Sequence, residues 1–138
     1  MTLTDAGPLV AILDRGQGSI HETCVAILPA LDPPLVTTWP CFTEAMHFLG
    51  RARGWSGRQS LWRLFEEGVL RIHEPRPQEI PRMMALMEKY DDLPMDLADS
   101  SIVVAAESLG VNRVFTLDSD FTVYRINGTQ AFEVVPLR

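Results

Sequence analysis

Strand-like and helix-like segments alternate along this chain, and this alternation constrains the fold more than any other feature of the sequence. The strand-like segments are short, rich in β-branched and apolar residues, and end near residues 4, 38, 73, 116 and 135. Helical spacing of apolar residues occupies most intervals between them, at about 7–14, 20–31, 40–52, 56–67, 77–90 and 96–109. Alternating strands and helices form a parallel sheet that is covered on both faces. We therefore predict an α/β fold with a central, mostly parallel sheet of about four to five strands.

The size and composition of the chain fit one soluble domain over residues 1–138. A chain of 138 residues with 46% hydrophobic and 22% charged residues can bury a full core. No apolar stretch is long enough to span a membrane, and the N-terminus lacks the basic region of a signal peptide, so a cytoplasmic protein is expected. Cys24 and Cys41 lie among apolar residues and are interpreted as core residues rather than as a disulfide or metal pair.

Glycine and proline residues mark the predicted helix ends. Gly54 separates the helices at 40–52 and 56–67, and Gly110 ends the helix that begins at Asp96. In the helix at 77–90, Pro81 has to lie in the first turn to be tolerated. The spacing within that helix predicts an inner face made of Ile80, Met83, Met84 and Met87. The methionines are interpreted as core or as a dimer surface.

Acidic residues stand beside several of these predicted strand and helix boundaries. Asp5 and Asp118 follow strands, and Glu44 lies one turn into the helix after the second strand. Asp96 and Asp99 open the helix at 96–109, where a spacing of three places both on one helix face. Ligands of open α/β sheets bind at the carboxyl ends of the strands, so these side chains are expected to converge. Converging carboxylates repel one another, and oxygen-only ligands favour Mg²⁺ or Mn²⁺ between them.

Each acidic residue also has a purely structural interpretation. Asp5 or Asp96 can cap a helix, and Asp99 in a first turn suits the helix dipole. Asp118 and Asp120 fit a turn, and Glu44 can be an ordinary solvated helix residue. The metal-site hypothesis therefore depends on all of the acidic sites meeting at one sheet edge.

Other kinds of catalytic site find less support in the sequence. There is no phosphate-binding glycine loop and no Gly-x-Ser-x-Gly segment. The histidines His21, His47 and His73 are scattered without zinc spacing and are interpreted as surface or packing residues. The Asp118-x-Asp120 pair does not follow the first strand, as an aspartyl-phosphate phosphatase would require.

The charge of the chain is acidic overall, but its basic residues are unevenly distributed. The net charge is −6, which disfavours nucleic-acid binding by bulk charge. Of the 12 basic residues 11 are arginines, and Arg51, Arg53, Arg58 and Arg63 lie close together in sequence. Arginine suits phosphate contacts, so Arg51, Arg53 and Arg58 are candidate substrate-binding residues. A solvated helical surface remains an equal alternative.

Four blocks of sequence together resemble the PIN-domain nucleases of the VapC type. They are Leu3–Asp14 around Asp5, Thr37–Ala45 around Glu44, Leu93–Ala106 around Asp96 and Asp99, and Val114–Phe121 around Asp118 and Asp120. No block is specific alone, but their order and spacing cover nearly the whole chain. The resemblance implies a single PIN-like domain with helices on both faces of the sheet.

The resemblance also assigns roles to the acidic residues. It implies a metal-binding and catalytic quartet of Asp5, Glu44, Asp99 and Asp118, with Asp96 and Asp120 as accessory metal ligands and Thr116 as a supporting hydroxyl. The chain departs from the pattern at Gly7, where many relatives carry Ser or Thr. A contact from that hydroxyl to substrate or to a metal-bound water is therefore missing.

The function implied by the resemblance is Mg²⁺- or Mn²⁺-dependent cleavage of RNA by an endoribonuclease. Such a protein is expected to be the toxin of a type II toxin–antitoxin pair, with a cognate antitoxin as partner and a homodimer as its assembly. The products would carry a 3′-hydroxyl and a 5′-phosphate. The alternative is a catalytically weak or inactive PIN-like module that binds RNA or a protein partner.

Overall fold

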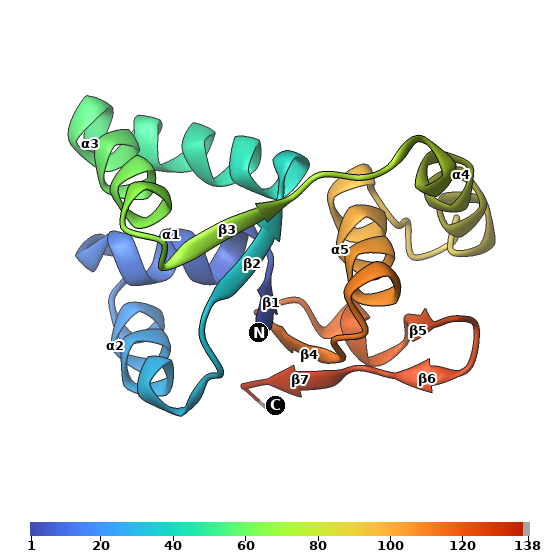
Figure 1. Cartoon of the computed structure of the whole chain (residues 1–138). Coiled ribbons are helices and arrows are strands. Elements are labelled where there is room, and N and C mark those ends of the chain that lie inside the picture. The colour runs from blue at the N-terminus through green and yellow to red at the C-terminus, as the bar shows by residue number, and fades with distance from the viewer. Residues whose placement is uncertain (137–138) are drawn as a thin grey trace.

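A five-stranded, fully parallel sheet forms the centre of the protein. The structure is a computed structural model that describes residues 1–136, so residues 137–138 of the predicted domain lie outside it. The strand order is β3-β2-β1-β4-β7 (Figure 1), and every neighbouring pair is parallel. The strands are β1 (Thr2–Thr4), β2 (Leu35–Thr38), β3 (Leu70–His73), β4 (Arg113–Phe115) and β7 (Glu133–Val135). The parallel α/β fold predicted from the sequence is confirmed.

Five α-helices surround the sheet and are joined by short 3₁₀ turns. The helices are α1 (Ala6–Leu13), α2 (Ser19–Ile27), α3 (Trp39–Glu66), α4 (Ile80–Lys89) and α5 (Leu97–Leu109). The 3₁₀ turns are η1 (Arg15–Gln17), η2 (Leu28–Ala30), η3 (Pro77–Glu79) and η4 (Ser119–Thr122). Pro81 lies in the first turn of α4, as the sequence requires.

The helices lie on both faces of the sheet, as Figure 1 shows. Side chains of paired residues point to the same face of a sheet. The aligned residues Leu3, Val36 and Val114 belong to the core that contains α4 and α5. Leu35 and Leu70 are also aligned, but they pack in a second core with α1, α2 and α3. The sheet therefore separates two apolar cores.

The order of the strands creates a crevice at one edge of the sheet. β1 lies between β2 and β4, and the chain leaves β1 toward β2 but leaves β4 toward β7 on the other side. The backbone N–H of Asp5 donates to the carbonyl of Phe115 across the two strand ends, with N and O 3.3 Å apart. A reversal of this kind opens a crevice beyond the carboxyl ends of the strands. The residues after β1 and β4 are thus placed beside the crevice.

Gly54 bends α3 rather than ending it. The two helices predicted on either side of Gly54 form one element, in which Gly54 has φ 60° and ψ −144°. A glycine tolerates this positive φ because it has no Cβ. The bend gives α3 two arms (Figure 1), before and after Gly54.

Three sequence-based expectations differ from the structure. The helix predicted for 20–31 ends at Ile27, and η2 follows because Pro29 cannot donate a helical hydrogen bond. The predicted inner face of α4 is correct at Met83 but wrong at Ile80 and Met84, which are 49% and 68% exposed, and Leu86 faces the core although it was not predicted to. The hairpin of β5 (Arg125–Ile126) and β6 (Gln130–Ala131) was not predicted, although Asn-Gly at 127–128 is a turn signal.

Both cysteines are completely buried, which confirms their interpretation as core residues. Cys41 packs with α5 and the sheet, and Cys24 packs between α2 and the core that contains α1 and α3. Within residues 1–136, no helix is both long enough and apolar enough to cross a membrane.

Candidate active site

A pocket of about 300 Å³ lies at the crevice beyond β1 and β4. Five acidic residues line it, and they come from four separate segments: Asp5, Glu44, Asp96, Asp99 and Asp118. The rest of the lining consists of small or apolar residues, namely Ala6, Gly7, Ala98 and Leu117. The structure therefore brings together residues that are up to 113 positions apart in the sequence. No basic residue is among those that line the pocket.

Asp5 is the most sheltered of these carboxylates. It follows β1 and stands at the N-cap of α1, but its side chain makes no capping hydrogen bond. Its Oδ2 accepts a hydrogen bond from Thr116 Oγ1 at 2.6 Å, whereas its Oδ1 is buried and has no hydrogen-bond partner among residues 1–136. Burial raises the pKa of Asp5 to about 7; the Thr116 bond opposes this, and Asp118, Asp99 and Glu44 add to it through their charge.

Thr116 connects Asp5 to the loop after β4. The Thr116 hydroxyl is almost fully buried, and it donates to Asp5 while accepting the backbone N–H of Asp118 at 2.9 Å. Asp118 Oδ1 in turn accepts the backbone N–H of Asp120 at 2.9 Å, so it closes the turn that begins η4. This chain of hydrogen bonds fixes Asp118 next to Asp5. Since Thr116 gives its one proton to Asp5 Oδ2, it leaves Asp5 Oδ1 unpaired.

Asp96 and Asp99 occupy the first turn of α5. Asp96 is the N-cap residue, and its Oδ1 accepts the backbone N–H of Asp99 at 2.8 Å. Asp99 Oδ2 accepts a hydrogen bond from the hydroxyl of Tyr124 at 2.9 Å. Partial burial and the nearby charge of Asp96 raise the pKa of Asp99 to about 7, against the effect of the Tyr124 bond. Asp96 therefore combines its structural capping role with a place in the pocket.

Glu44 and Asp120 stand at the margins of the site. Glu44 is an exposed residue on the first arm of α3, and its pKa is raised by partial burial and by the charge of Asp96. Asp120 is not among the residues that line the pocket, but burial and the charge of Asp118 raise its pKa. The acidic residues thus form a graded set, from the buried Asp5 to the peripheral Asp120.

The chemistry of the pocket fits a hard divalent cation. Its polar side chains are carboxylates, which Mg²⁺ and Mn²⁺ prefer. The buried, unpartnered Asp5 Oδ1 and the raised pKa values of Asp5 and Asp99 mark uncompensated negative charge, which a cation would offset. Within residues 1–136, however, no three acidic, histidine or cysteine side chains already form a metal-binding group.

Gly7 also lines the pocket, at the second position of α1. A Cβ at this position would lie 3.5 Å from Leu117 Cδ1 and 3.8 Å from Asp5 Oδ1, which are ordinary contacts. A serine would therefore fit there without displacing neighbours. The missing hydroxyl is not explained by lack of space.

The candidate substrate-binding arginines do not line the acidic pocket. Arg51, Arg53 and Arg58 are all exposed on α3, two before and one after the bend at Gly54. Arg51 lies seven residues after Glu44, which places it on the same side of the first arm two turns further along. Arg58 lines a separate groove on α3.

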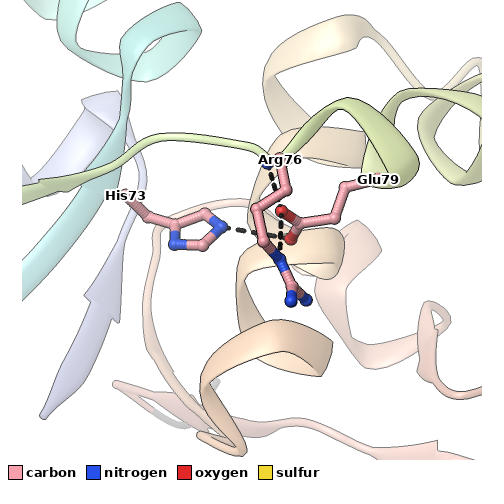
Figure 2. Close-up of polar contacts among 3 residues, drawn as sticks. All are labelled: His73, Arg76 and Glu79. Carbon is pink, nitrogen blue, oxygen red and sulfur yellow. Dashed lines mark hydrogen bonds and ion pairs between the residues drawn. The ribbon is translucent and has the colours of Figure 1, made fainter.

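None of the three histidines lines the acidic pocket, in agreement with their interpretation as surface or packing residues. His21 Nδ1 lies 2.7 Å from the carbonyl of Ala11, and His47 is exposed. The Nε2 of His73 lies 3.2 Å from Glu79 Oε1, and Figure 2 shows this contact as a dashed line. Burial by itself raises the pKa of Glu79, but the backbone N–H of Arg76 and the His73 ring outweigh this effect and hold the pKa below its ordinary value. These contacts fasten η3 to the end of β3.

The parallel sheet and the pocket at its strand ends together define an α/β domain with a carboxylate-lined site. The chain is similar to a solved structure, that of Mycobacterium tuberculosis VapC20, which is described as a sarcin-ricin loop cleaving toxin. The TM-score is 0.80, with 15% sequence identity over 89% of this chain and 94% of that one. At this identity the likeness shows a shared fold. No protein-family model and no curated protein matches the sequence.

Tyr124 is a site residue that the sequence did not reveal. It is fully buried behind the pocket, and its ring packs edge-on against Tyr90 and Phe121. It lies two residues beyond the end of η4, so its approach to Asp99 depends on how the chain turns after Asp118. No local pattern in Phe-Thr-Val-Tyr signals this contact.

Replacing Tyr124 by Phe is expected to shift the ionisation of Asp99 toward higher pH. The substitution removes a hydrogen bond that favours the ionised form of Asp99, so the pKa of Asp99 rises further above about 7. The ionised fraction of Asp99 at pH 7 should fall by roughly 3- to 10-fold and recover by about pH 9, because one pKa unit is a tenfold change in ionisation. An NMR titration of the Asp99 carboxyl group from pH 6 to 9 tests this.

Tyr90→Phe is the matched control, since its hydroxyl bonds the backbone N–H of Arg125 instead of a pocket carboxylate. Both variants should lose a similar hydrogen-bond contribution to stability, about 0.5–1.5 kcal/mol. Equal pH profiles for the two variants would contradict a role of Tyr124 in tuning Asp99.

Proposed function

We propose that this protein is a Mg²⁺- or Mn²⁺-dependent endoribonuclease of the PIN type. The observation that carries the proposal is the convergence of five carboxylates on one pocket around the unpartnered, buried Asp5 Oδ1. Uncompensated charge of this kind is costly to fold and is typical of functional sites. The structural likeness to a toxin described as cleaving the sarcin-ricin loop supports RNA as the substrate.

In this proposal the quartet of Asp5, Glu44, Asp99 and Asp118 holds the metal, and Asp96 and Asp120 act as accessory ligands. A bound divalent ion supplies charge neutralisation at the scissile phosphate and a nucleophilic water at neutral pH. Thr116 holds Asp5 in place through its hydrogen bond, and Tyr124 does the same for Asp99. Both hydroxyls donate to the carboxylates, which leaves the other carboxylate oxygens free to act as ligands.

The protein residues contribute orientation and exclusion of water as well as metal ligation. Asp118 is fixed by the backbone N–H of Asp120, and Asp99 by its own position in the first turn of α5. Ala6, Ala98 and Leu117 line the pocket between the carboxylates and limit the water around them. Arg51, Arg53 and Arg58 are the proposed contacts to the RNA backbone, at positions outside the pocket.

We further propose that the protein is the toxin of a type II toxin–antitoxin pair, acts in the cytoplasm and forms a homodimer. The support for this is the shared fold with VapC20, which its description calls a toxin. Expression with and without a co-expressed neighbouring gene product tests this part. Growth arrest that the neighbour relieves, and that Asp99→Asn abolishes, is the expected result.

A cleavage assay tests the nuclease proposal directly. Purified protein is incubated with single-stranded and structured RNA in Mn²⁺, with and without EDTA. The expected result is cleavage that requires metal and is lost in Asp99→Asn, and product analysis should show 3′-hydroxyl and 5′-phosphate ends. Cleavage that persists in Asp99→Asn would point to a contaminating nuclease. RNA retention without any cleavage would favour the alternative of a binding module.

A further inference from the structure

A second hollow on the surface lies beside the acidic pocket, in the angle between the two arms of α3. This aromatic groove has a volume of about 370 Å³ and is lined by residues from both arms, among them Trp39, Phe42, Met46, His47, Arg58 and Trp62. Pockets for small ligands commonly measure about 300–1,000 Å³. The groove is therefore large enough for a planar group such as a nucleobase.

The aromatic rings of the groove form a connected, partly exposed platform. Phe42 is buried, and it meets Trp39 and Trp62 edge-on at centroid distances of 5.6 and 5.0 Å. The two tryptophans remain 40% and 37% exposed. Tryptophan rings that are held in place by packing yet reach solvent offer stacking surface at little cost in side-chain entropy.

Glycines hold the two arms of α3 close together and shape the groove. A Cβ at Gly57 would lie 2.5 Å from the carbonyl oxygen of Leu49, so only glycine allows the arms to approach this closely. A Cβ at Gly50 would lie 2.9 Å from Arg58 Nη1 and 3.4 Å from Arg58 Cδ. The side chain of Arg58 therefore lies across Gly50, where no side chain competes for the space.

Arg58 adds an uncompensated positive charge to these rings. Within residues 1–136 it has no ion pair and no side-chain hydrogen bond, unlike Arg76, Arg82 and Arg113. An unpaired guanidinium beside exposed aromatic rings complements a ligand that combines a planar π-system with negative charge. A nucleotide is such a ligand, because its base stacks and its phosphate binds arginine.

The aromatic groove adjoins the acidic pocket through the first arm of α3. Thr43 lines the groove and its neighbour Glu44 lines the pocket. His47, which also lines the groove, stands one helical turn after Glu44, a separation of about 5–6 Å between Cβ atoms. An RNA strand with a phosphate at the carboxylates would therefore carry its neighbouring nucleotides over the groove.

We propose that the aromatic groove binds an unpaired base of the RNA substrate by stacking on Trp62 or Trp39, with Arg58 contacting that nucleotide. The proposal rests on the nuclease function and adds a site of substrate selection to it. It implies a preference for single-stranded or looped RNA, since only an unstacked base can enter the groove. A protein segment in the groove is the competing occupant, and the test below separates the two.

The test measures binding in EDTA, so that it does not depend on cleavage. A fluorescently labelled single-stranded RNA oligonucleotide is titrated with wild-type protein, Trp62→Ala and the control Trp55→Ala, whose tryptophan is exposed on α3 but does not line the groove. Trp62→Ala is expected to raise the Kd by about 5- to 150-fold, the range for loss of one stacked base, and Trp55→Ala to leave it unchanged. Circular dichroism and melting curves confirm that each variant is folded.

Two further experiments test whether the loss of binding comes from the groove itself. Gly50→Ala displaces the Arg58 guanidinium without removing its charge. Both Gly50→Ala and Arg58→Ala should weaken RNA binding several-fold. Arg63→Ala should leave binding unchanged, because Arg63 does not line the groove. A scan that replaces one base at a time by an abasic residue should show a sharp loss at one position. That loss should disappear in Trp62→Ala, since the two changes remove the same contact.

The inference is overturned if wild-type protein does not bind the oligonucleotide, if Trp62→Ala binds as wild type does, or if the abasic scan is flat. Any of these outcomes would reject the groove as a site that binds a base of the RNA. Binding that depends on Trp62 without cleavage in Mn²⁺ would instead support the groove while rejecting the proposed nuclease activity. If Trp62→Ala cleaves RNA with the same KM as wild type, base binding in the groove is rejected and the proposed nuclease activity stands.

Discussion

Asp5→Asn is expected to abolish RNA cleavage and, at the same time, to raise the melting temperature of the metal-free protein above pH 7. Asp5 Oδ1 is buried and has no hydrogen-bond partner within residues 1–136, so in the proposed site the substitution removes a central metal ligand. Cleavage should fall by on the order of 10³-fold or more, because metal stabilisation of the transition state contributes several kcal/mol. The gain in stability arises because the same burial makes the charged form of Asp5 unfavourable in the folded protein.

The pH dependence of this effect follows from the direction of the pKa change. The pKa of Asp5 is raised from 3.8 to about 7 on folding, so between these values the folded protein binds more protons than the unfolded chain. The contribution of Asp5 to the free energy of unfolding is therefore highest below about pH 4. It falls as the pH rises to about 7 and stays reduced above that. Asn cannot ionise, so the melting temperature of the variant relative to wild type should increase from pH 4 to pH 8.

Thermal melts of both proteins from pH 4 to 8 in EDTA measure this difference. Glu66→Gln is a suitable control, because Glu66 is exposed at the end of α3, does not line the pocket and has no ion pair within residues 1–136. Its melting temperature should follow that of wild type at every pH. If the difference between Asp5→Asn and wild type were the same at pH 4 and pH 8, Asp5 would not be a strained carboxylate.

The second large effect is expected from metal addition. Mg²⁺ or Mn²⁺ that binds only the folded state should stabilise the wild-type protein by about 2.7 kcal/mol at 100 times its Kd. For a domain of this size that corresponds to an increase in melting temperature of roughly 10 °C. In the proposed site, the ion would relieve the mutual repulsion of Asp5, Asp99 and Asp118, which raises the pKa values of Asp5 and Asp99 in the metal-free protein.

Asp99→Asn should reduce the metal-induced increase to a small fraction of the wild-type value, and Glu66→Gln should retain it in full. The increase should also shrink from pH 8 to pH 6, because protons compete with the metal for Asp5 and Asp99 as the pH falls below about 7. Differential scanning calorimetry at several metal concentrations provides the measurement. The same increase in Asp99→Asn as in wild type would place the metal elsewhere.

Local sequence patterns were sufficient to predict most of the fold. β2 begins and ends where its β-branched residues predict, and Gly54 and Gly110 bend or end helices as their lack of a Cβ allows. The face of α4 was mispredicted at Ile80 and Met84, because the apolar residues of this helix allow more than one stripe to be drawn. The stripe that contains Met83 and Leu86 is the one that faces the core.

The acidic positions were predictable because strand ends can be located from sequence, and parallel strands bring their carboxyl ends to one edge. What could not be predicted was how unequal these positions are. The burial of Asp5, the capping of α5 by Asp96 and the support from Tyr124 all depend on contacts between distant segments. The aromatic groove was missed for a related reason, since it exists only because Gly57 lets the two arms of α3 meet.

The hydrogen bond between Thr116 and Asp5 spans 111 positions of the chain, and this separation has a consequence for synthesis. Domains emerge from the ribosome N-terminal end first. Asp5 is therefore synthesised 113 residues before Asp118, and before all of β4. A nascent or prematurely terminated chain that lacks β4 holds only part of the carboxylate set and cannot assemble the pocket. The proposed cleavage of RNA would therefore be absent until β4 and Asp118 have been added to the chain.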